Sequence, residues 1–460
     1  MTDRSRVSPN LDNGQTLRPT IDQIIEKLPL GRPHYWVMAA AMLGFFFDAF
    51  DTAIMSLALP SVTADWTLTS FQGGLIGSAS LWGMGIGALT LGFLSDVYGR
   101  RIVMVITVLG VGLFTGLSAL SFSPESLIAF RFITGLFIGA MIPIDLAYVA
   151  EIAPLKRRGL FLAALGLMWP VGQVAAAITA SFVVPTLGWR VLFVIGIVPA
   201  LFALWIRARV PESPRWLAKK GRLDEAVAVA RRLGANVSVD DVAPSEEEGG
   251  RRSWRAWLIL FSPKYAVRTF ATSALFFLHQ FQSYGWAVWV PTILFVALGY
   301  DLKGALSTTI LLYVGSIIGR LVLLFTADRI GRRPAMMTTY AVMAVCCLSV
   351  PALLGLGNWT VVFVAILFVY NAANESSPLQ IWIAELFPTE VRGIGSSFAS
   401  AAGRVGGGIG PIVFGLLMDA EITQWVFFTI AICAVLIILI TRFVLRIETS
   451  GRSLARVGAV

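Results

Sequence analysis

The stretch LSDVYGRR (Leu94–Arg101) has a second copy, TADRIGRR (Thr326–Arg333), which begins 232 residues later. An aspartate, a glycine and two arginines keep the same spacing in both copies. A second pair of stretches, AEIAPLKRRG (Ala150–Gly159) and AELFPTEVRG (Ala384–Gly393), repeats at an offset of 234. Two matches at nearly the same offset predict that the chain consists of two duplicated halves.

Composition places these halves in a membrane. The 460 residues are 57% hydrophobic and 14% charged, with a mean hydropathy of +0.77, whereas soluble domains carry about 25% charged residues. Apolar runs long enough to cross a bilayer occur in two groups of six. They cover 36–59, 71–94, 102–121, 126–150, 160–184 and 189–208, then 266–294, 305–327, 335–355, 359–384, 394–418 and 424–445.

We predict an all-α polytopic membrane protein with 12 transmembrane helices in two pseudo-symmetric six-helix halves. Parallel duplicates of six spans are typical of transporters whose substrate site lies between the halves. The predicted divisions are a cytoplasmic segment at 1–34, the two bundles at 35–208 and 266–446, a cytoplasmic linker at 209–265 and a cytoplasmic tail at 447–460. In the linker, LDEAVAVARRLG (Leu223–Gly234) has the apolar spacing and terminal glycine of an amphipathic helix.

The distribution of Lys and Arg predicts the orientation. Basic residues gather in the connections after the second and fourth spans of each half and in the linker, while the alternate connections are nearly bare of them. The positive-inside rule then puts both termini in the cytoplasm, and we expect a multi-pass protein of the cell (inner) membrane. The first 34 residues lack the apolar core of a cleaved signal peptide.

The repeated loop motifs predict gates. An aspartate can pair with an arginine or a helix N-terminus in one conformation and release it in another. A plain turn with a topology signal is the alternative, which explains the arginines but not the repeated Asp and Gly. The predicted gating residues are Asp96, Gly99, Arg100, Arg101, Glu151, Arg158, Asp328, Arg332, Arg333, Glu385 and Arg392. We expect Glu151 to pair with Arg158, and Glu385 with Arg392.

Two aspartates stand inside the first span, in GFFFDAFDTA (Gly44–Ala53). On a helix, Asp48 and Asp51 are about 60° apart in azimuth and about 4.5 Å apart along the axis, so they share a face. Two carboxylates so close disfavour double ionisation, and a carrier coupled to protons needs such a group. We predict that this pair binds the proton; the alternative is a structural pair satisfied by polar neighbours or an arginine.

Other polar residues inside the spans extend the predicted site. Arg131 and Arg404, one from each half, have guanidinium groups suited to a planar carboxylate, although Arg131 is near enough to the end of its span to snorkel instead. We predict proton coupling for His279 and Glu375, with a packing role as the alternative for His279. The remaining predicted substrate-binding residues are Gln173, Gln282, Tyr284, Trp286 and Asn371. Asp145 and Arg320 also need polar partners, which the sequence does not identify.

These motifs resemble those of a known family. The chain as a whole resembles a major facilitator superfamily transporter, and its repeated loop is similar to the signature loop of that superfamily. PESPRWL (Pro211–Leu217) and ELFPTEVRG (Glu385–Gly393) resemble the branch related to sugar porters, which includes niacin, aromatic-acid and organic-ion carriers. RFITGLFIGAMIPI (Arg131–Ile144) and AAGRVGGGIGP (Ala401–Pro411) resemble spans of the aromatic acid:proton symporters and their niacin-transporter relatives.

Two departures from the patterns affect the substrate. DAFD (Asp48–Asp51) is similar to the D-G-x-D element of the aromatic acid:proton symporters but has Ala49 in place of the glycine. HQFQSYGWAVWVP (His279–Pro291) stands where sugar porters usually carry Gln-Gln-x-Ser-Gly, and this difference disfavours a plain hexose site.

The resemblance implies proton-coupled uptake of a small organic anion, an aromatic or heteroaromatic carboxylate, by alternating access. The alternatives are a proton-coupled sugar or organic-cation transporter, and a drug or metabolite exporter of the same fold. A non-transporting sensor would need a longer tail than the one that follows the last span. We expect the protein to work as a monomer with a small-molecule substrate, protons and the lipid bilayer as partners, and without nucleic acid.

The sequence disfavours other classes of protein. No G-x-x-x-x-G-K-[ST] motif supports an ATP-driven pump, and no nucleophile elbow or nucleotide-binding loop supports an enzyme. Two histidines and three cysteines, all three cysteines in apolar runs, do not form a metal-binding pattern. We therefore expect no enzymatic activity, no metal and no cofactor, with the proton gradient as the energy source.

Overall fold

The computed structural model describes residues 18–91, 93–155, 157–243, 258–297, 299–354, 360–388 and 391–449, with the backbone alone at 297, 327, 328, 354 and 360. The side chain of the predicted gating residue Asp328 therefore lies outside this description. The same holds for residues 244–257 of the predicted linker and for the end of the tail from residue 450.

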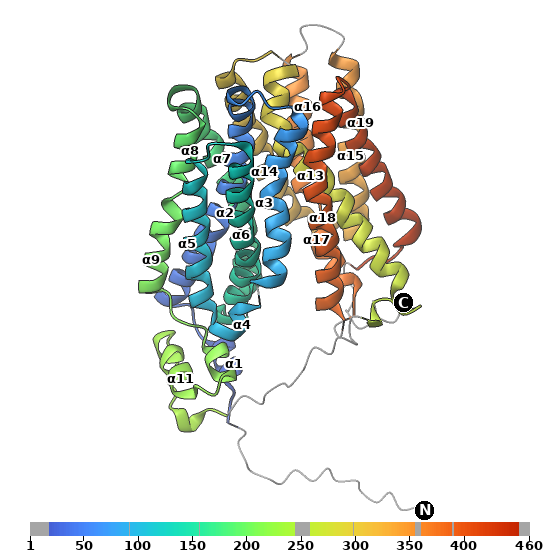
Figure 1. Cartoon of the computed structure of the whole chain (residues 1–460). Helices are drawn as coiled ribbons and strands as arrows, with labels where there is room; N and C mark the ends of the chain where they lie inside the picture. The colour runs from blue at the N-terminus through green and yellow to red at the C-terminus, as the bar shows by residue number, and fades with distance from the viewer. Residues whose placement is uncertain are drawn as a thin grey trace, which may run out of the picture.

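Helices of the N-terminal half form one bundle (Figure 1). In chain order its spans are α2 (Arg32–Asp65), α3 (Ser70–Thr90), α5 (Arg100–Ser118), α6 (Pro124–Ile152), α7 (Arg158–Leu187) and the pair α8 (Trp189–Ile195) and α9 (Val198–Arg209). The sixth span is thus two helices rather than the single run that we predicted. Pro199 stands in the first turn of α9. Proline is tolerated there because its missing N–H would have no partner within the helix, but inside a continuous helix it would remove a hydrogen bond and clash with the preceding turn.

The C-terminal half repeats this arrangement. Its spans are α13 (Ala266–Ala297), α14 (Leu302–Ile330), α15 (Arg332–Leu354), α16 (Thr360–Glu375) with α17 (Leu379–Leu386), α18 (Arg392–Asp419) and α19 (Gln424–Leu439), which continues as η2 (Ile440–Val444). The tenth span breaks between α16 and α17 because Pro378 cannot continue the helix. The described helices confirm the predicted all-α fold of two six-span halves.

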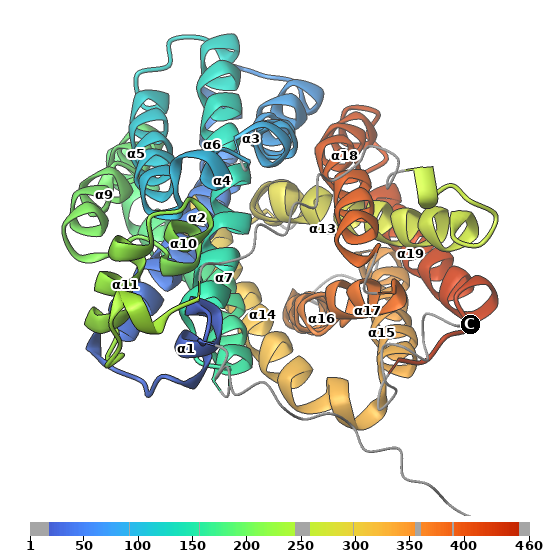
Figure 2. The same cartoon turned by 90° about the horizontal axis from the view of Figure 1, so that it is seen from below.

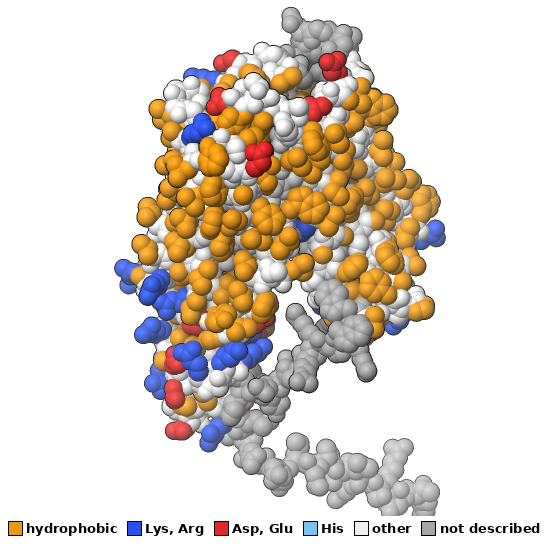
Figure 3. All heavy atoms as spheres, in the orientation of Figure 1, with side chains coloured by type: hydrophobic (Ala, Val, Ile, Leu, Met, Phe, Trp, Pro, Cys, Tyr) orange, Lys and Arg blue, Asp and Glu red, His pale blue; other side chains and the backbone are white. Residues whose placement is uncertain are grey.

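The surface and the lengths of the helices fit a membrane protein. In the described ranges, nine segments are long and apolar enough to cross a bilayer, with α8 and α9 counted as one of them. Hydrophobic side chains cover the flanks of the molecule, and many Lys and Arg side chains lie at the lower end of the N-terminal half (Figure 3). This belt of apolar side chains matches the hydrocarbon core of a bilayer.

Short helices cover the lower end of the N-terminal half in Figure 1, which we call the α4 end. They are α1 (Ile21–Lys27), α4 (Leu94–Tyr98), α10 (Pro214–Lys219), α11 (Leu223–Arg232) and the single turn η1 (Val239–Asp241). The predicted amphipathic helix of the linker is confirmed as α11. Its apolar face buries Ala226, Val227 and Ala230, and Gly234 follows it with φ +108°.

The two halves meet along three helix pairs: α3 with α18, α7 with α14 and α2 with α13. Seen from the α4 end, the two bundles lie on either side of these pairs (Figure 2). At the opposite end, Asp419 accepts hydrogen bonds from the backbone N–H of Ser70 at 2.6 Å and of Phe71 at 2.7 Å. This carboxylate at the N-terminus of α3 holds the halves together away from the α4 end.

Glycines bring α3 and α6 into close contact inside the N-terminal half. A Cβ on Gly83 would lie 2.1 Å from the carbonyl oxygen of Phe132, and one on Gly87 would lie 1.9 Å from that of Leu136. On α6, Gly135 and Gly139 face the backbone of α3 in the same way. Small residues let membrane helices approach to backbone contact, so this pair forms a rigid support beside the first span.

Candidate functional site

A buried ion pair joins the first and fourth spans. Arg131 of α6 donates to both carboxylate oxygens of Asp51 of α2, from Nη1 at 2.9 Å and from Nη2 at 2.6 Å. Thr115 of α5 donates a short third hydrogen bond to the same carboxylate. Arg131 is 0% exposed and Asp51 is 2% exposed, so Arg131 does not snorkel to the surface.

Asp48 lies one turn before this pair and has a different environment. Both of its oxygens are buried and lack a hydrogen-bond partner within the described part of the chain. Asp51, Asp145 and Arg404 lie within electrostatic range of Asp48. The predicted pair of aspartates thus consists of one carboxylate bound by an arginine and one that is available to a proton.

Arg404 stands near the middle of α18 at the junction of the two halves. Its Nη1 lies 3.8 Å from the sulfur of Met84 of α3, and a Cβ on Gly85 would lie 3.4 Å from its own Cβ. Among the described residues, no carboxylate comes within the 4.0 Å of an ion pair with Arg404. The guanidinium is half-buried and has no carboxylate counter-ion in the part of the chain that the structure describes.

Two aromatic rings lie beside Arg404. A Cβ on Gly408 of α18 would lie 2.6 Å from the indole of Trp82 of α3, and one on Gly407 would lie 2.8 Å from the ring of Tyr284 of α13. These glycines therefore make room for a ring from each half. A pocket opens next to them, and its lining includes Ser56, Ser80, Gln173, Tyr284 and Tyr313. Gln173 and Tyr284, which we predicted to bind substrate, are among these lining residues.

The other predicted residues of the C-terminal half form contacts of their own. Glu375 of α16 pairs with Arg320 of α14 at 2.5 Å. The Nδ1 atom of His279 and the hydroxyl of Tyr340 share a hydrogen bond of 2.8 Å. Asn371 donates to the carbonyl oxygen of Leu367 in its own helix at 2.8 Å. Arg320 and Glu375 thus neutralise each other.

Trp286 and Gln282 lie away from the junction of the halves. The indole of Trp286 packs against Tyr370 of α16 and Phe427 of α19, with ring centroids 5.5 and 6.0 Å away. Gln282 is 0% exposed and lies one helical turn before Trp286, on the same face of α13. Both side chains belong to the interior of the C-terminal half, so we leave them out of the proposed site.

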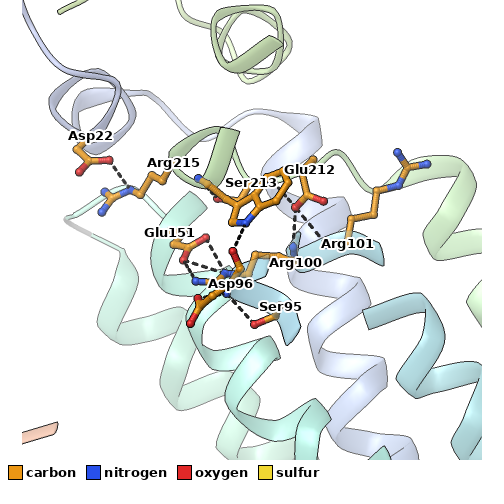
Figure 4. Close-up of polar contacts among 10 residues, drawn as sticks. Asp22, Ser95, Asp96, Arg100, Arg101, Glu151, Glu212, Ser213 and Arg215 are labelled. Carbon is orange, nitrogen blue, oxygen red and sulfur yellow. Dashed lines mark hydrogen bonds and ion pairs between the residues drawn. The ribbon is translucent and has the colours of Figure 1, made fainter. Parts of the chain in front are cut away.

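The first loop motif forms a polar cluster at the α4 end (Figure 4). The guanidinium of Arg100 pairs with Asp96 at 2.5 Å and with Glu151 at 3.0 Å, and it also donates to Ser95 at 2.7 Å. This cluster joins α4, the start of α5 and the end of α6. The predicted gating residues Asp96, Arg100 and Glu151 are therefore in direct contact.

A residue that we did not predict completes this cluster. Glu212 accepts hydrogen bonds from the backbone N–H of Arg100 at 2.8 Å and of Arg101 at 3.1 Å, which are the first N–H groups of α5. Gly99 has φ +106°, and a Cβ there would lie 2.4 Å from the carboxylate of Glu212. Burial raises the pKa of Glu212 above its usual range, because it outweighs these N–H donors and the charge of Arg101.

The second loop motif repeats this geometry. Arg332 pairs with Glu385 at 3.1 Å, and Glu448 accepts hydrogen bonds from the N–H groups of Arg332 and Arg333 at 3.0 Å each. Gly331 has φ +94°, and a Cβ there would lie 3.0 Å from Glu448. A carboxylate at the start of α15 is favoured by the dipole of that helix, as it is at the start of α5.

The predicted partners within the motifs were wrong. Glu151 and Glu385 pair with the first arginine of each loop motif, and not with Arg158 and Arg392. Arg158 begins α7 and faces α1, where it pairs with Glu26 at 3.4 Å. Arg100 is the first residue of α5 and Arg332 the first residue of α15. Their guanidinium groups therefore reach Glu151 at the end of α6 and Glu385 at the end of α17.

Residues 36–460 match the protein family described as "Sugar (and other) transporter". The chain belongs to this family of the major facilitator superfamily. As the sequence predicted, this major facilitator protein is a transporter and not an enzyme.

Several curated relatives of this transporter have names that state a cargo. It is 30% identical to the niacin transporter NiaP of Acinetobacter baylyi, over 94% of this chain and 98% of that protein. It is 28% identical to the 4-hydroxybenzoate transporter PcaK of the same organism, over 88% and 89% of the two chains. The inner membrane metabolite transport protein YgcS of Escherichia coli is 30% identical over 84% and 85%.

Solved structures share the fold of this transporter. The xylose transporter XylE from E. coli in an inward open conformation superposes with a TM-score of 0.73 at 21% identity, over 93% of this chain and 99% of that chain. The proton:xylose symporter XylE bound to 6-bromo-6-deoxy-D-glucose gives a TM-score of 0.70 at 22% identity, over 93% and 98%. At this identity the likeness concerns the fold alone.

Sequence signals existed for some residues that we did not predict. Glu212 stands in PESPRWL and Glu448 in IETSGR. A Glu followed by a hydroxyl residue therefore comes shortly after the last span of each half. Each of these glutamates also accepts the N–H of the residue after it, Ser213 at 2.8 Å and Thr449 at 2.9 Å. Trp82 had no such signal, because one more aromatic residue in an apolar span does not stand out from the others.

Proposed function

We propose that this transporter carries out proton-coupled uptake of a small organic anion, an aromatic or heteroaromatic carboxylate, by alternating access. The observation that carries the proposal is the guanidinium of Arg404 at the junction of the halves. Arg131 and Arg320 are neutralised by Asp51 and Glu375, whereas Arg404 has no carboxylate partner in the ranges that the structure describes. A carboxylate substrate would supply that partner through two parallel hydrogen bonds.

The surroundings of Arg404 fit a flat ring. Trp82 and Tyr284 come from opposite halves and lie against the glycines of α18. An aromatic carboxylate would place its ring between them while its charged end meets Arg404. The niacin and hydroxybenzoate carriers among the relatives transport ring carboxylates, as their names state, and this supports the assignment.

Asp48 supplies the coupling in this proposal. Its carboxylate lies within electrostatic range of Arg404, so an ionised Asp48 competes with the substrate for the field of that guanidinium. A proton on Asp48 removes the competing charge and strengthens binding of the anion. Substrate and proton then bind together, which is the requirement for symport.

The loop clusters act as gates in this proposal. Arg100 with Glu151 and Arg332 with Glu385 tie the helix ends at the α4 end, each within its own half. Because each contact lies inside one half, it opens only when the helix ends within that half move relative to one another as the halves rock about the central site. We place the α4 end in the cytoplasm of a cell, in its inner membrane, because the Lys and Arg side chains gather there.

A thermal-shift panel on purified protein tests the substrate class. The panel pairs each ring carboxylate with its neutral amide, benzoate with benzamide and nicotinate with nicotinamide, and adds a hexose and a quaternary amine. Because a ligand that binds the folded state stabilises it by mass action, we expect stabilisation by the carboxylates alone, and more at acidic than at neutral pH.

Variants of Arg404 sharpen this test. Replacing Arg404 by Gln removes a charged hydrogen-bond donor worth about 1.5–3 kcal/mol, so affinity for the carboxylate should fall about 10- to 100-fold. Lysine should restore part of it, because it keeps the charge without the planar pair of donors. Stabilisation by hexose or amine alone would refute the anion assignment and leave the transporter fold unaffected.

A further inference from the structure

A second buried carboxylate lies beside Asp48 on the seam between α2 and α6. Asp145 of α6 is 1% exposed, and neither of its oxygens has a hydrogen-bond partner among the described residues. Its Oδ2 lies 2.5 Å from the position that a Cβ on Gly44 of α2 would occupy. Gly44 precedes Asp48 by one helical turn, so the two aspartates face each other on this seam.

Two unpartnered carboxylates in one dry seam cannot both be ionised at reasonable cost. Each buried charge without a counter-ion costs several kcal/mol, even after the protein relaxes. One proton on the pair would change this balance, because the protonated carboxyl is neutral and its O–H could donate to the other carboxylate. Asp51 is not part of this pair, because its carboxylate is bound by Arg131 and Thr115.

The seam continues from Asp145 toward the α4 end. One turn further along α6, Val149 packs beside His34 and Val37 of α2, with no room for a water molecule between them. His34 is 1% exposed, and its Nε2 has no partner in the described part of the chain. Apolar side chains, Val149 and Val37, thus stand between Asp145 and His34 on this seam.

We propose that Asp145 is a second proton-binding residue, which takes the proton from Asp48. In this step the Asp48 O–H bond breaks and an O–H bond forms on Asp145, so the pair keeps one proton and one negative charge throughout. This inference rests on the proposed proton symport.

The charged and titratable groups around this pair are few. On α2 they are Asp51 and His34, on α6 Arg131 and Tyr148, on α13 Tyr284 and on α18 Arg404. Tyr148 stands in the turn after Asp145 and donates its hydroxyl to the carbonyl oxygen of Pro211. Arg404 lies within electrostatic range of Asp48 and of Tyr284, so in this proposal substrate binding to Arg404 shifts the proton between Asp48 and Asp145.

The first experiment compares transport modes in proteoliposomes with labelled nicotinate as the probe. Asp145→Asn should keep exchange of labelled for unlabelled nicotinate within about two-fold of the wild type, because Arg404 and the gates are intact. Accumulation driven by a proton gradient should fall at least about ten-fold, since the amide cannot take up the proton. Asp145→Glu should restore part of it, and Asp65→Asn, a carboxylate at the opposite end, should behave as the wild type.

The outcomes separate this inference from the proposed function. Proton-driven accumulation by Asp145→Asn at the wild-type level would overturn the role of Asp145 and leave the symport proposal standing. Nicotinate transport without proton movement in the wild type would refute the coupling itself. Loss of exchange together with accumulation in a folded Asp145→Asn protein would assign Asp145 to the substrate route and contradict the relay.

Infrared difference spectra between acidic and alkaline pH give a readout that needs no substrate. We expect the band of protonated carboxyl groups in the wild type to lose intensity in Asp145→Asn, and the remaining band to shift in Asp48→Asn because the pair shares its proton. A carboxyl band in Asp145→Asn identical to that of the wild type would overturn the proposal. The same spectra report folding of each variant through the amide bands.

Discussion

Neutralising Asp51 should damage the protein more than removing the whole ion pair. Asp51→Asn leaves Arg131 fully buried next to an amide that cannot balance its charge. The double variant Asp51→Asn with Arg131→Gln replaces both charges by neutral groups that still hydrogen-bond each other. We therefore expect the double variant to be more stable than Asp51→Asn alone.

The magnitude follows from burial and geometry. The pair has two N–H···O contacts of 2.9 and 2.6 Å and no access to water from Arg131. Breaking such a buried pair by removing one partner costs about 3–5 kcal/mol, while replacing both partners is often nearly neutral. The coupling energy of the double-mutant cycle should then be about 2 kcal/mol or more, at the upper end of the range for residues in contact.

Reversible unfolding in detergent micelles, followed by helical circular dichroism, measures this cycle for the wild type, both single variants and the double variant. A matched cycle on Arg320 and Glu375, which keep partial exposure of 25% and 14%, should give a smaller coupling energy because water screens the charges. Additivity of the two Asp51–Arg131 single changes within about 0.5 kcal/mol would refute the reasoning, because it would mean that the pair is not a coupled buried unit.

Three further predictions follow from the described contacts. Gly87→Ala should destabilise the protein by about 1–3 kcal/mol through overpacking, because its Cβ would lie 1.9 Å from a carbonyl oxygen. Gly159→Ala, whose Cβ would have nothing within 4 Å, should be neutral or slightly stabilising. Chemical unfolding of both variants measures the difference. Because the pKa of Glu212 is raised, its contribution to stability is present at acidic pH and is lost as pH rises through the folded-state pKa. Glu212→Gln should therefore lose less stability than the wild type between acidic and neutral pH, as measured by thermal unfolding. Trp82→Ala should weaken binding of a ring carboxylate by about 0.5–1.5 kcal/mol. Trp286→Ala should instead lower stability by about 3–5 kcal/mol without changing the affinity of the remaining folded protein. Calorimetric titration of both variants distinguishes the loss of affinity from the loss of stability.

Sequence reasoning predicted the architecture because the signals for it are local and repeated. Each apolar run reports its own span, and the duplicated loop motif reports the two halves without any knowledge of packing. The breaks at Gly196 and Pro378 were missed, because proline in a membrane helix is often tolerated and hydropathy alone does not show where a helix is interrupted.

Partner choice within the site was beyond the sequence. Asp48 and Asp51 look equivalent in the chain, yet α6 places Arg131 on Asp51 and an unpartnered carboxylate, Asp145, next to Asp48. The difference arises from the close contact at Gly44, which depends on how two helices cross. Neither the spacing along α2 nor the composition of α6 contains that information.

Loop pairings show the same limit. Glu151 stands seven residues from Arg158 in the chain but binds Arg100 from another connection. The pairing is set by Gly99, whose positive φ turns the chain so that α5 begins directly under the end of α6. A sequence shows that such a turn is possible, and only the packed helices show which carboxylate it meets.

Proton movement coupled to a ring carboxylate tests the central claim most directly. Nicotinate is added to proteoliposomes at equal pH inside and outside, and the pH of a weakly buffered external medium is recorded, with protein-free liposomes as the control for passive diffusion of the acid. The account predicts external alkalinisation that exceeds this control in the wild type and falls to the control level in Arg404→Gln. Uptake of labelled nicotinate without any proton movement above the control, or equal proton movement in Arg404→Gln, would contradict it.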